Sequence, residues 1–370
     1  MRIGVPREIK VHEYRVGLTP ASVRELAAHG HQVLVERDAG HGIRAGDDDY
    51  RAAGAEVLPT AGDVFERAEL IVKVKEPQAV ERALLRADHV LFTYLHLAPD
   101  PTQCADLVKS GATCIAYETV TQPGGGLPLL APMSEVAGRL AVQAGAHSLE
   151  RVQGGAGILL GGVPGVPPGR IVILGAGVVG TNAAQMAVGS GAIVVVIDRS
   201  LDALRRIEQR LGARVVTVHA NRESIEREVR RADLLIGAVL VPGAAAPKLV
   251  SRELVSRMRP GAVIVDVAID QGGCVETARP TTHAEPTYLV DGVVHYCVAN
   301  MPGAVPRTST YALNHATLPF VLALADKGWR QALRDDGHLR AGLNLCAGQV
   351  CNAEVAHALG YTNVAAEDLI

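Results

Sequence analysis

The feature that most constrains the fold is a glycine-rich turn between two apolar runs. Ile171–Leu174 is a short apolar run of the kind that is buried in a parallel sheet, and a second, β-branched run covers Ile193–Ile197. The turn between them contains the three glycines of a G-x-G-x-x-G sequence, Gly175, Gly177 and Gly180. The order of strand, turn, helix and strand predicts a βαβ unit that binds a dinucleotide.

Each glycine has its own role in such a unit. The first permits a tight turn, the second lets the backbone approach a pyrophosphate, and the third lets the helix pack closely on the strand. Backbone N–H groups at the helix N-terminus then face the phosphates. Asp198 ends the second run, where a carboxylate accepts hydrogen bonds from ribose hydroxyls and repels a 2′-phosphate. This pattern favours NAD(H) over NADP(H), a preference that the neighbouring Arg199 weakens. A glycine-rich turn without a ligand is the alternative.

Composition excludes several other classes of protein. The 370 residues are enough for two domains with cores of their own, and a net charge of −3 with dispersed basic residues argues against a nucleic-acid partner. No stretch approaches the roughly 18 uninterrupted apolar residues of a membrane span, and the first residues lack the apolar core of a signal peptide. Six cysteines without a C-x-x-C pair predict free thiols. We therefore expect a cytoplasmic protein with no membrane partner.

The rest of the chain predicts a second α/β domain. Short strands alternate with helices from Arg2–Val5 to Thr113–Ala116, ahead of the glycine-rich turn. A helix from Ser134 to about Arg151 is expected to bridge the domains, and Val293–Val298 is expected to be the last strand of the second one. The tail from Pro306 onward has helical spacing and is expected to return to the first domain.

The predicted architecture is therefore an α/β protein of two domains. A Rossmann NAD-binding domain, residues 131–305, is inserted into a discontinuous α/β substrate domain, residues 1–130 and 306–370.

Polar residues that follow strands are the candidates for chemistry, because open α/β sheets bind ligands beyond the carboxyl ends of their strands. Lys75 and His96 follow two predicted strands of the first domain, and Asp270 follows one of the second. Arg15 lies in a polar loop near the N-terminus. Arginine pairs with a carboxylate, lysine polarises a carbonyl and histidine transfers a proton at neutral pH. Facing one another across a cleft that holds nicotinamide, these groups would bind and oxidise an amino or hydroxy acid.

Each candidate also has a more ordinary interpretation. Arg15 alone is typical of a solvated surface arginine. Lys75 alternates with Lys73, which is typical of an exposed strand edge. His96 stands between two leucines, as a core histidine does, and Asp270 could cap a turn before two glycines.

Seven stretches spread over the whole chain carry a resemblance to a known family: residues 1–26, Val72–Pro77, Phe92–Leu97, Ala131–Gly138, Gly175–Asp198, Val265–Gly273 and Val298–Pro306. On these the chain resembles the L-alanine dehydrogenase family. The wider family also contains the NAD-binding subunit of proton-translocating transhydrogenase and enzymes of the saccharopine pathway.

The resemblance implies a reaction and roles. L-alanine, NAD⁺ and water would give pyruvate, ammonium and NADH. Arg15 and Lys75 would bind the substrate carboxylate and carbonyl, while His96 and Asp270 would be the acid/base residues. Whether Asp270 orders the water or accepts its proton stays open. The usual assembly of the family is a homohexamer, so we expect a homo-oligomer.

The resemblance also implies a set of cofactor contacts in addition to the glycine turn. They are Ser134, Val178, Val179, Asp198, Val239, Leu240, Val267, Ala268, Ile269, Asp270, Arg279, Val298, Ala299, Asn300 and Met301.

Three departures from the family pattern change what is expected. Ala203 and Ala220 stand where a lysine and a serine commonly contact the cofactor, which predicts altered adenosine binding. A glutamate and a histidine that bind a divalent metal in some members correspond to Ala323 and Lys327, so no metal is expected there.

Two other functions compete with alanine oxidation. One is a transhydrogenase-like NAD(H)-binding subunit that passes hydride to a partner protein, and the other is a non-catalytic NAD-binding module. The presence of Arg15, Lys75, His96 and Asp270 together argues against both. A dehydrogenase for another small amino acid also stays open, because the methyl pocket, to which Met133 and Met301 could belong, discriminates one methylene by only about 1–3 kcal/mol.

Overall fold

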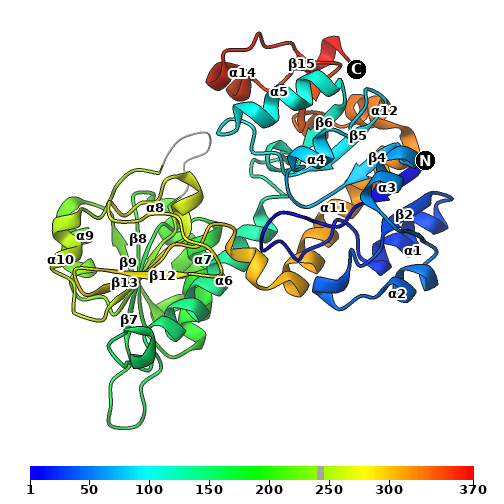
Figure 1. Cartoon of the computed structure of the whole chain (residues 1–370). Helices are drawn as coiled ribbons and strands as arrows, with labels where there is room; N and C mark the ends of the chain where they lie inside the picture. The colour runs from blue at the N-terminus through cyan, green and yellow to red at the C-terminus, as the bar shows by residue number, and fades with distance from the viewer. Residues whose placement is uncertain (240–245) are drawn as a thin grey trace. The chain divides into compact units, whose positions relative to one another are not determined.

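The chain forms two compact units in the computed structural model, which describes residues 1–239 and 246–370. The first unit contains Met1–Met133 and Val305–Ile370, and the second contains Ser134–Ala304. In Figure 1 the second unit carries the green to yellow segments of the chain. The tail from residue 305 thus joins the N-terminal segment in one unit.

The first unit is built on an eight-stranded sheet with the order β15-β14-β6-β5-β4-β1-β2-β3. Its parallel strands are β1 (Arg2–Val5), β2 (Gln32–Glu36), β3 (Glu56–Leu58), β4 (Leu70–Val72), β5 (Val90–Thr93) and β6 (Thr113–Ala116). Two short strands, β14 (Leu343–Cys346) and β15 (Gln349–Val350), add antiparallel pairs at one edge. β4 therefore lies inside the sheet, between β1 and β5.

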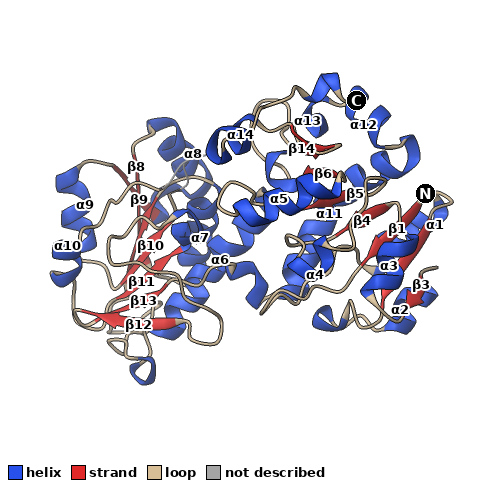
Figure 2. Ribbon diagram, turned by 45° about the horizontal axis from the view of Figure 1, so that its top comes forward, coloured by secondary structure: helices blue, strands red, loops and turns tan. Residues whose placement is uncertain are grey.

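The helices of the first unit cover both sides of this sheet (Figure 2). They are α1 (Pro20–Ala28), α2 (Asp47–Ala52), α3 (Ala61–Arg67), α4 (Ala79–Arg82), α5 (Pro101–Ser110), α11 (Pro306–Lys327), α12 (Trp329–Asp335), α13 (Gly337–Arg340) and α14 (Ala353–Leu359). Side chains from α3, α5 and α14 share one buried apolar cluster with the strands. α1 begins after Thr19, because the Thr19 side chain accepts the Ser22 N–H and Pro20 takes the first turn.

The second unit is a doubly wound sheet with the order β12-β13-β11-β10-β7-β8-β9. Its parallel strands are β7 (Arg170–Leu174), β8 (Ile193–Asp198), β9 (Val215–His219), β10 (Leu234–Gly237), β11 (Val263–Asp266) and β13 (Val293–Tyr296), with β12 (Thr287–Val290) antiparallel to β13. Its helices are α6 (Ala131–Ser148), α7 (Val178–Gly189), α8 (Leu201–Leu211), α9 (Arg222–Val229) and α10 (Arg252–Ser256). The α/β fold class with a Rossmann unit is confirmed.

Several predicted elements differ from the structure. α6 begins at Ala131 and not at Ser134, because Pro132 fits the first turn of a helix. The tail is not helical throughout, since it contributes β14 and β15, and β12 precedes the strand at Val293. These strands have two to four residues and pair antiparallel with a strand already in the sheet. Their formation depends on that partner more than on local pattern.

Two further expectations concern thiols and membranes. All six cysteines are free, and all except Cys351 are buried, which confirms the predicted free thiols. Among residues 1–239 and 246–370, no helix has the length and apolar character needed to cross a bilayer.

The glycine-rich turn of the second unit owes its shape to close backbone packing. Gly175 has φ of 104°, a left-handed conformation that disfavours other residues. A Cβ built on Gly180 lies 1.8 Å from the carbonyl oxygen of Gly175, a distance that no side chain tolerates. A Cβ built on Gly177 meets nothing within 4 Å, so that position faces open space. The first and third glycines are therefore structural, and the second leaves room for a ligand.

Replacing Gly180 tests this packing. We expect Gly180→Ala to lower the free energy of unfolding by about 1–3 kcal/mol, because the added methyl group forces α7 away from the turn. Gly189→Ala, at the other end of α7, is the matched control, since a Cβ there meets nothing within 4 Å. Urea unfolding of both variants measures the difference, and equal stability would contradict the packing account.

Candidate active site

Arg15 lies in the interior of the first unit. Its side chain is 2% exposed, so the surface interpretation is wrong. Glu13 binds it twice, with Nε 2.7 Å from Oε1 and a terminal nitrogen 2.6 Å from Oε2, and the other terminal nitrogen lies 3.0 Å from Sδ of Met133. Burial alone lowers the pKa of Arg15, but the hydrogen bonds and charge of Glu13 outweigh it and raise that pKa. Arg15 is thus a fixed, charged guanidinium.

The lysines after β4 occupy two different environments. Lys73 is fully buried in the middle of the sheet, so the exposed-edge interpretation is wrong. Its Nζ lies 3.1 Å from Oε2 of Glu8 and 2.7 Å from Oε1 of Glu81. Lys75 is partly exposed, and its carbonyl accepts a hydrogen bond from the Thr93 hydroxyl. Of these two lysines, Lys75 is therefore the one that a solute can approach.

His96 follows β5 in a strained conformation. Its φ is 49°, and its side chain is 43% exposed, so the core-histidine interpretation is wrong. The backbone N–H groups of Leu95 and His96 both donate to the carboxylate of Glu118, at 3.1 and 2.6 Å from Oε1. The imidazole stacks on the Tyr94 ring, with 5.7 Å between ring centres. Glu118 and Tyr94 together present the imidazole to solvent.

The structure brings three of the predicted residues together in the first unit. β4 and β5 are paired parallel neighbours, so Lys75 and His96 lie beyond the carboxyl ends of adjacent strands. Burial raises the pKa of Tyr94, and the nearby charge of Arg15 reduces that rise. Tyr94 therefore lies near the charge of Arg15 and stacks on His96, and this part of the first unit gathers two cations and an imidazole.

Asp270 belongs to the second unit. It lies in a short 3₁₀ turn, Val267–Gln271, after β11, and its side chain is exposed. The cap of this turn is Asp266, whose Oδ1 accepts the Ala268 N–H at 3.2 Å. The N-terminal cap of this turn is therefore Asp266, four residues before Asp270.

Asp198 connects the end of β8 to the glycine-rich turn. Its Oδ2 accepts the Ala176 N–H at 2.7 Å, and its Oδ1 accepts the Ser200 N–H at 2.7 Å. Both oxygens stay at the carboxyl end of the strand, where a ribose would be expected. The predicted acid thus also holds the turn in place.

Most other residues predicted to contact the cofactor follow strands of the same sheet. Val178 and Val179 begin α7 after β7, and Val239 follows β10. Val267, Ala268 and Ile269 follow β11, whereas Val298, Ala299, Asn300 and Met301 follow β13. Ser134 lies on α6, and the Arg279 guanidinium stacks on the Tyr288 ring at 4.1 Å. Leu240 falls outside the described residues.

The positions that depart from the family pattern have definite surroundings. Ala203 is buried in α8, and its N–H is capped by the Ser200 hydroxyl. Ala220 directly follows β9 and packs against the apolar core of the second unit. Lys327 ends α11 and forms an ion pair with Asp335, with Nζ 2.7 Å from Oδ2.

Sequence reasoning missed three carboxylates, Glu8, Glu13 and Glu118. Glu8 follows β1 and Glu118 follows β6, so the strand-end rule applied to every strand of the first unit would have selected both. Glu13 gives no such signal, apart from its distance of two residues from Arg15 in the same loop.

A doubly wound unit with this glycine turn and acid, in one chain with a unit that gathers two cations and an imidazole, is typical of a nicotinamide-dependent oxidoreductase. The sequence pattern of the alanine dehydrogenase/PNT N-terminal domain matches residues 4–137, and that of the C-terminal domain matches residues 141–353. The chain belongs to the alanine dehydrogenase/PNT family.

Individual relatives cover the whole chain. An alanine dehydrogenase of Halomonas elongata is 61% identical over 370 residues, which is 100% of both chains. One of Mycobacterium tuberculosis is 54% identical over 97% of both chains. A solved L-alanine dehydrogenase superposes with a TM-score of 0.95 at 56% identity, covering 97% of this chain and 99% of that one. A transhydrogenase of Sinorhizobium meliloti is more distant, with a TM-score of 0.81 at 26% identity over 95% of this chain and 99% of that one.

The buried ion pair of Arg15 can be tested by unfolding. We expect Glu13→Ala to lower the free energy of unfolding by about 3–5 kcal/mol, because it leaves a buried charge without its partner. The double variant Glu13→Leu/Arg15→Met removes both charges and should lose less than Glu13→Ala alone. Glu226→Ala, which breaks an exposed pair with Arg222, should change the value by less than about 1 kcal/mol. Equal losses in the two single variants would contradict the account.

Proposed function

We propose that this chain catalyses the reversible, NAD-dependent oxidative deamination of L-alanine. L-alanine, NAD⁺ and water give pyruvate, ammonium, NADH and one proton. The observation that carries the proposal is the grouping of Arg15, Lys75 and His96 at one corner of the first sheet, in a chain whose full-length relatives are alanine dehydrogenases. The transhydrogenase alternative has weaker support, because that relative is only 26% identical.

The residues of the first unit would bind the substrate and move its protons. Arg15 would bind the carboxylate, and its contact with Met133 supports a place for that methionine beside the methyl group. Lys75 would polarise the carbonyl of pyruvate or of the imine. His96 would give and take the protons of the carbinolamine, a step worth on the order of 10²–10⁴ in rate. Its exposed imidazole beside a carboxylate suits that exchange.

The second unit fits a dinucleotide. The open space at Gly177 and the N-terminus of α7 suit a pyrophosphate, and Asp198 suits the ribose hydroxyls. NAD⁺ would supply the hydride acceptor. Asp270 would order the attacking water or take its proton. Val178, Val179 and the residues that follow β10, β11 and β13 would line the remainder of the cofactor.

Other features of the proposal have separate grounds. The homohexamer rests on the family, whereas the cytoplasmic location and the absence of nucleic-acid and membrane partners rest on charge and composition. We also propose that residues 131–305 serve as the NAD domain and residues 1–130 and 306–370 as the substrate domain. Ala203 and Ala220 would change adenosine binding, and Ala323 and Lys327 would hold no metal.

NADH formation from L-alanine tests the reaction. We expect the purified protein to reduce NAD⁺ with L-alanine, and to reduce NADP⁺ or act on other small amino acids more slowly. His96→Ala should lower the rate by on the order of 10²–10⁴, whereas His357→Ala, on the exposed side of α14, should not change it. A silent wild type that still binds NADH would contradict the proposal and favour a hydride carrier or a binding module.

A further inference from the structure

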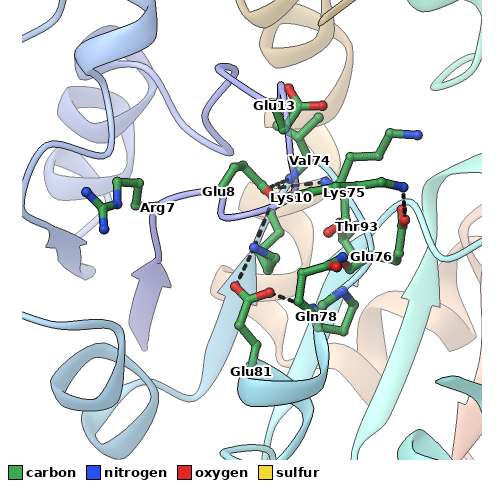
Figure 3. Close-up of polar contacts among 12 residues, drawn as sticks. Arg7, Glu8, Lys10, Glu13, Val74, Lys75, Glu76, Gln78, Glu81 and Thr93 are labelled. Carbon is green, nitrogen blue, oxygen red and sulfur yellow. Dashed lines mark hydrogen bonds and ion pairs between the residues drawn. The ribbon is translucent and has the colours of Figure 1, made fainter. Parts of the chain in front are cut away.

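Glu8 contacts the chain segment that carries Lys75 without being part of the proposed machinery. It lies just beyond β1, and its side chain is 2% exposed. Its Oε1 accepts the Val74 N–H at 2.7 Å and the Lys75 N–H at 3.3 Å, while its Oε2 lies 3.1 Å from Nζ of Lys73 (Figure 3). One buried carboxylate therefore holds three consecutive residues at the end of β4.

The position of Glu8 in the sheet explains these contacts. β1 pairs with β4 only through Ile3 with Leu70 and Gly4 with Ile71, whereas β5 follows β4 as far as Val72. After β1 the chain turns away from β4, so β1 no longer pairs with the residues that follow β4. On that side of the segment the Glu8 carboxylate accepts the backbone N–H groups instead. A buried N–H needs such an acceptor, since losing it costs roughly 1–3 kcal/mol.

The opposite side of the segment is held as well. The Thr93 hydroxyl donates to the Lys75 carbonyl at 3.0 Å, and Tyr94 N–H donates to the Val74 carbonyl. Lys73 is also bound by Glu81, whose second oxygen accepts the Gln78 N–H at the start of α4. Both peptide groups around Lys75 are thus fixed by hydrogen bonds. Of the four residues named here that bind this segment, Glu8 alone comes from the N-terminal loop.

We propose that Glu8 is a positioning residue for Lys75, fixing the backbone from which the lysine reaches the substrate carbonyl. The inference rests on the proposed function, in which Lys75 binds that carbonyl. A side chain displaced by a fraction of an ångström aligns poorly with a reacting carbonyl, so loss of Glu8 affects substrate steps more than cofactor binding. The residues proposed to bind the cofactor belong to the second unit and have no bond to Glu8 among those described.

The test compares Glu8→Gln with Glu36→Gln. Glu36 is the matched control because it is also buried and its Oε2 accepts the N–H of Arg7, in the same loop, without touching the end of β4. We expect Glu8→Gln to raise the KM for pyruvate and lower kcat/KM by about tenfold or more, with the Kd for NADH changed by less than about twofold. Glu36→Gln should leave the KM for pyruvate within about twofold of wild type.

Hydrogen–deuterium exchange gives a readout that does not need activity. The peptide containing Val74 and Lys75 should exchange faster in Glu8→Gln than in wild type or Glu36→Gln. If Glu8→Gln does not fold, Glu8→Asp serves instead, because it keeps the charge for Lys73 but shortens the reach to the two N–H groups.

The outcomes separate the two proposals. An active wild type whose Glu8 variants keep the KM for pyruvate and lose only thermal stability would overturn the role of Glu8. A wild type that forms no NADH from L-alanine would instead overturn the proposed function.

Discussion

The first unit depends on a pairing of buried charges. Arg15 and Lys73 are almost completely removed from solvent, and a cation in that position costs several kcal/mol unless a carboxylate meets it. The loop after β1 supplies one carboxylate to each cation, Glu13 to Arg15 and Glu8 to Lys73, and Glu81 of α4 supplies Lys73 with a second one. The same interactions that neutralise the charges fix the loop and the end of β4. Stability and the shape of the candidate site therefore have one physical cause, and neither can be changed without the other.

The second unit depends on the backbone geometry of its glycine-rich turn and not on buried charges. Its glycine turn needs one left-handed residue, one position open to a ligand and one helix residue without a Cβ. Asp198 then ties the turn to the next strand through the Ala176 N–H. In each unit the polar residues gather at the carboxyl ends of parallel strands. A parallel sheet places those ends along one edge, which explains why residues distant in sequence can serve one site within a unit.

Much of this was predictable from local pattern. The bounds of β1 and β6 agree with the sequence analysis, and so does the glycine turn with its terminal acid, because apolar runs and glycine-rich turns are local signals. The burial of Arg15 and the exposure of His96 were not predictable in this way. Arg15 is buried only because Glu13 binds it, and His96 is exposed because Glu118 holds its backbone in a left-handed conformation. The strand β14 was not predicted for a related reason, because its pairing partner β6 lies more than 200 residues earlier in the chain.

Isotope transfer tests most directly whether this chain oxidises L-alanine with a nicotinamide acceptor. The protein would be incubated with NAD⁺ and L-alanine that carries deuterium on Cα, and the NADH would be examined by NMR. The account predicts one deuterium at C4 of the nicotinamide ring for each pyruvate formed. NADH without deuterium, or pyruvate without NADH, would contradict direct hydride transfer from the substrate.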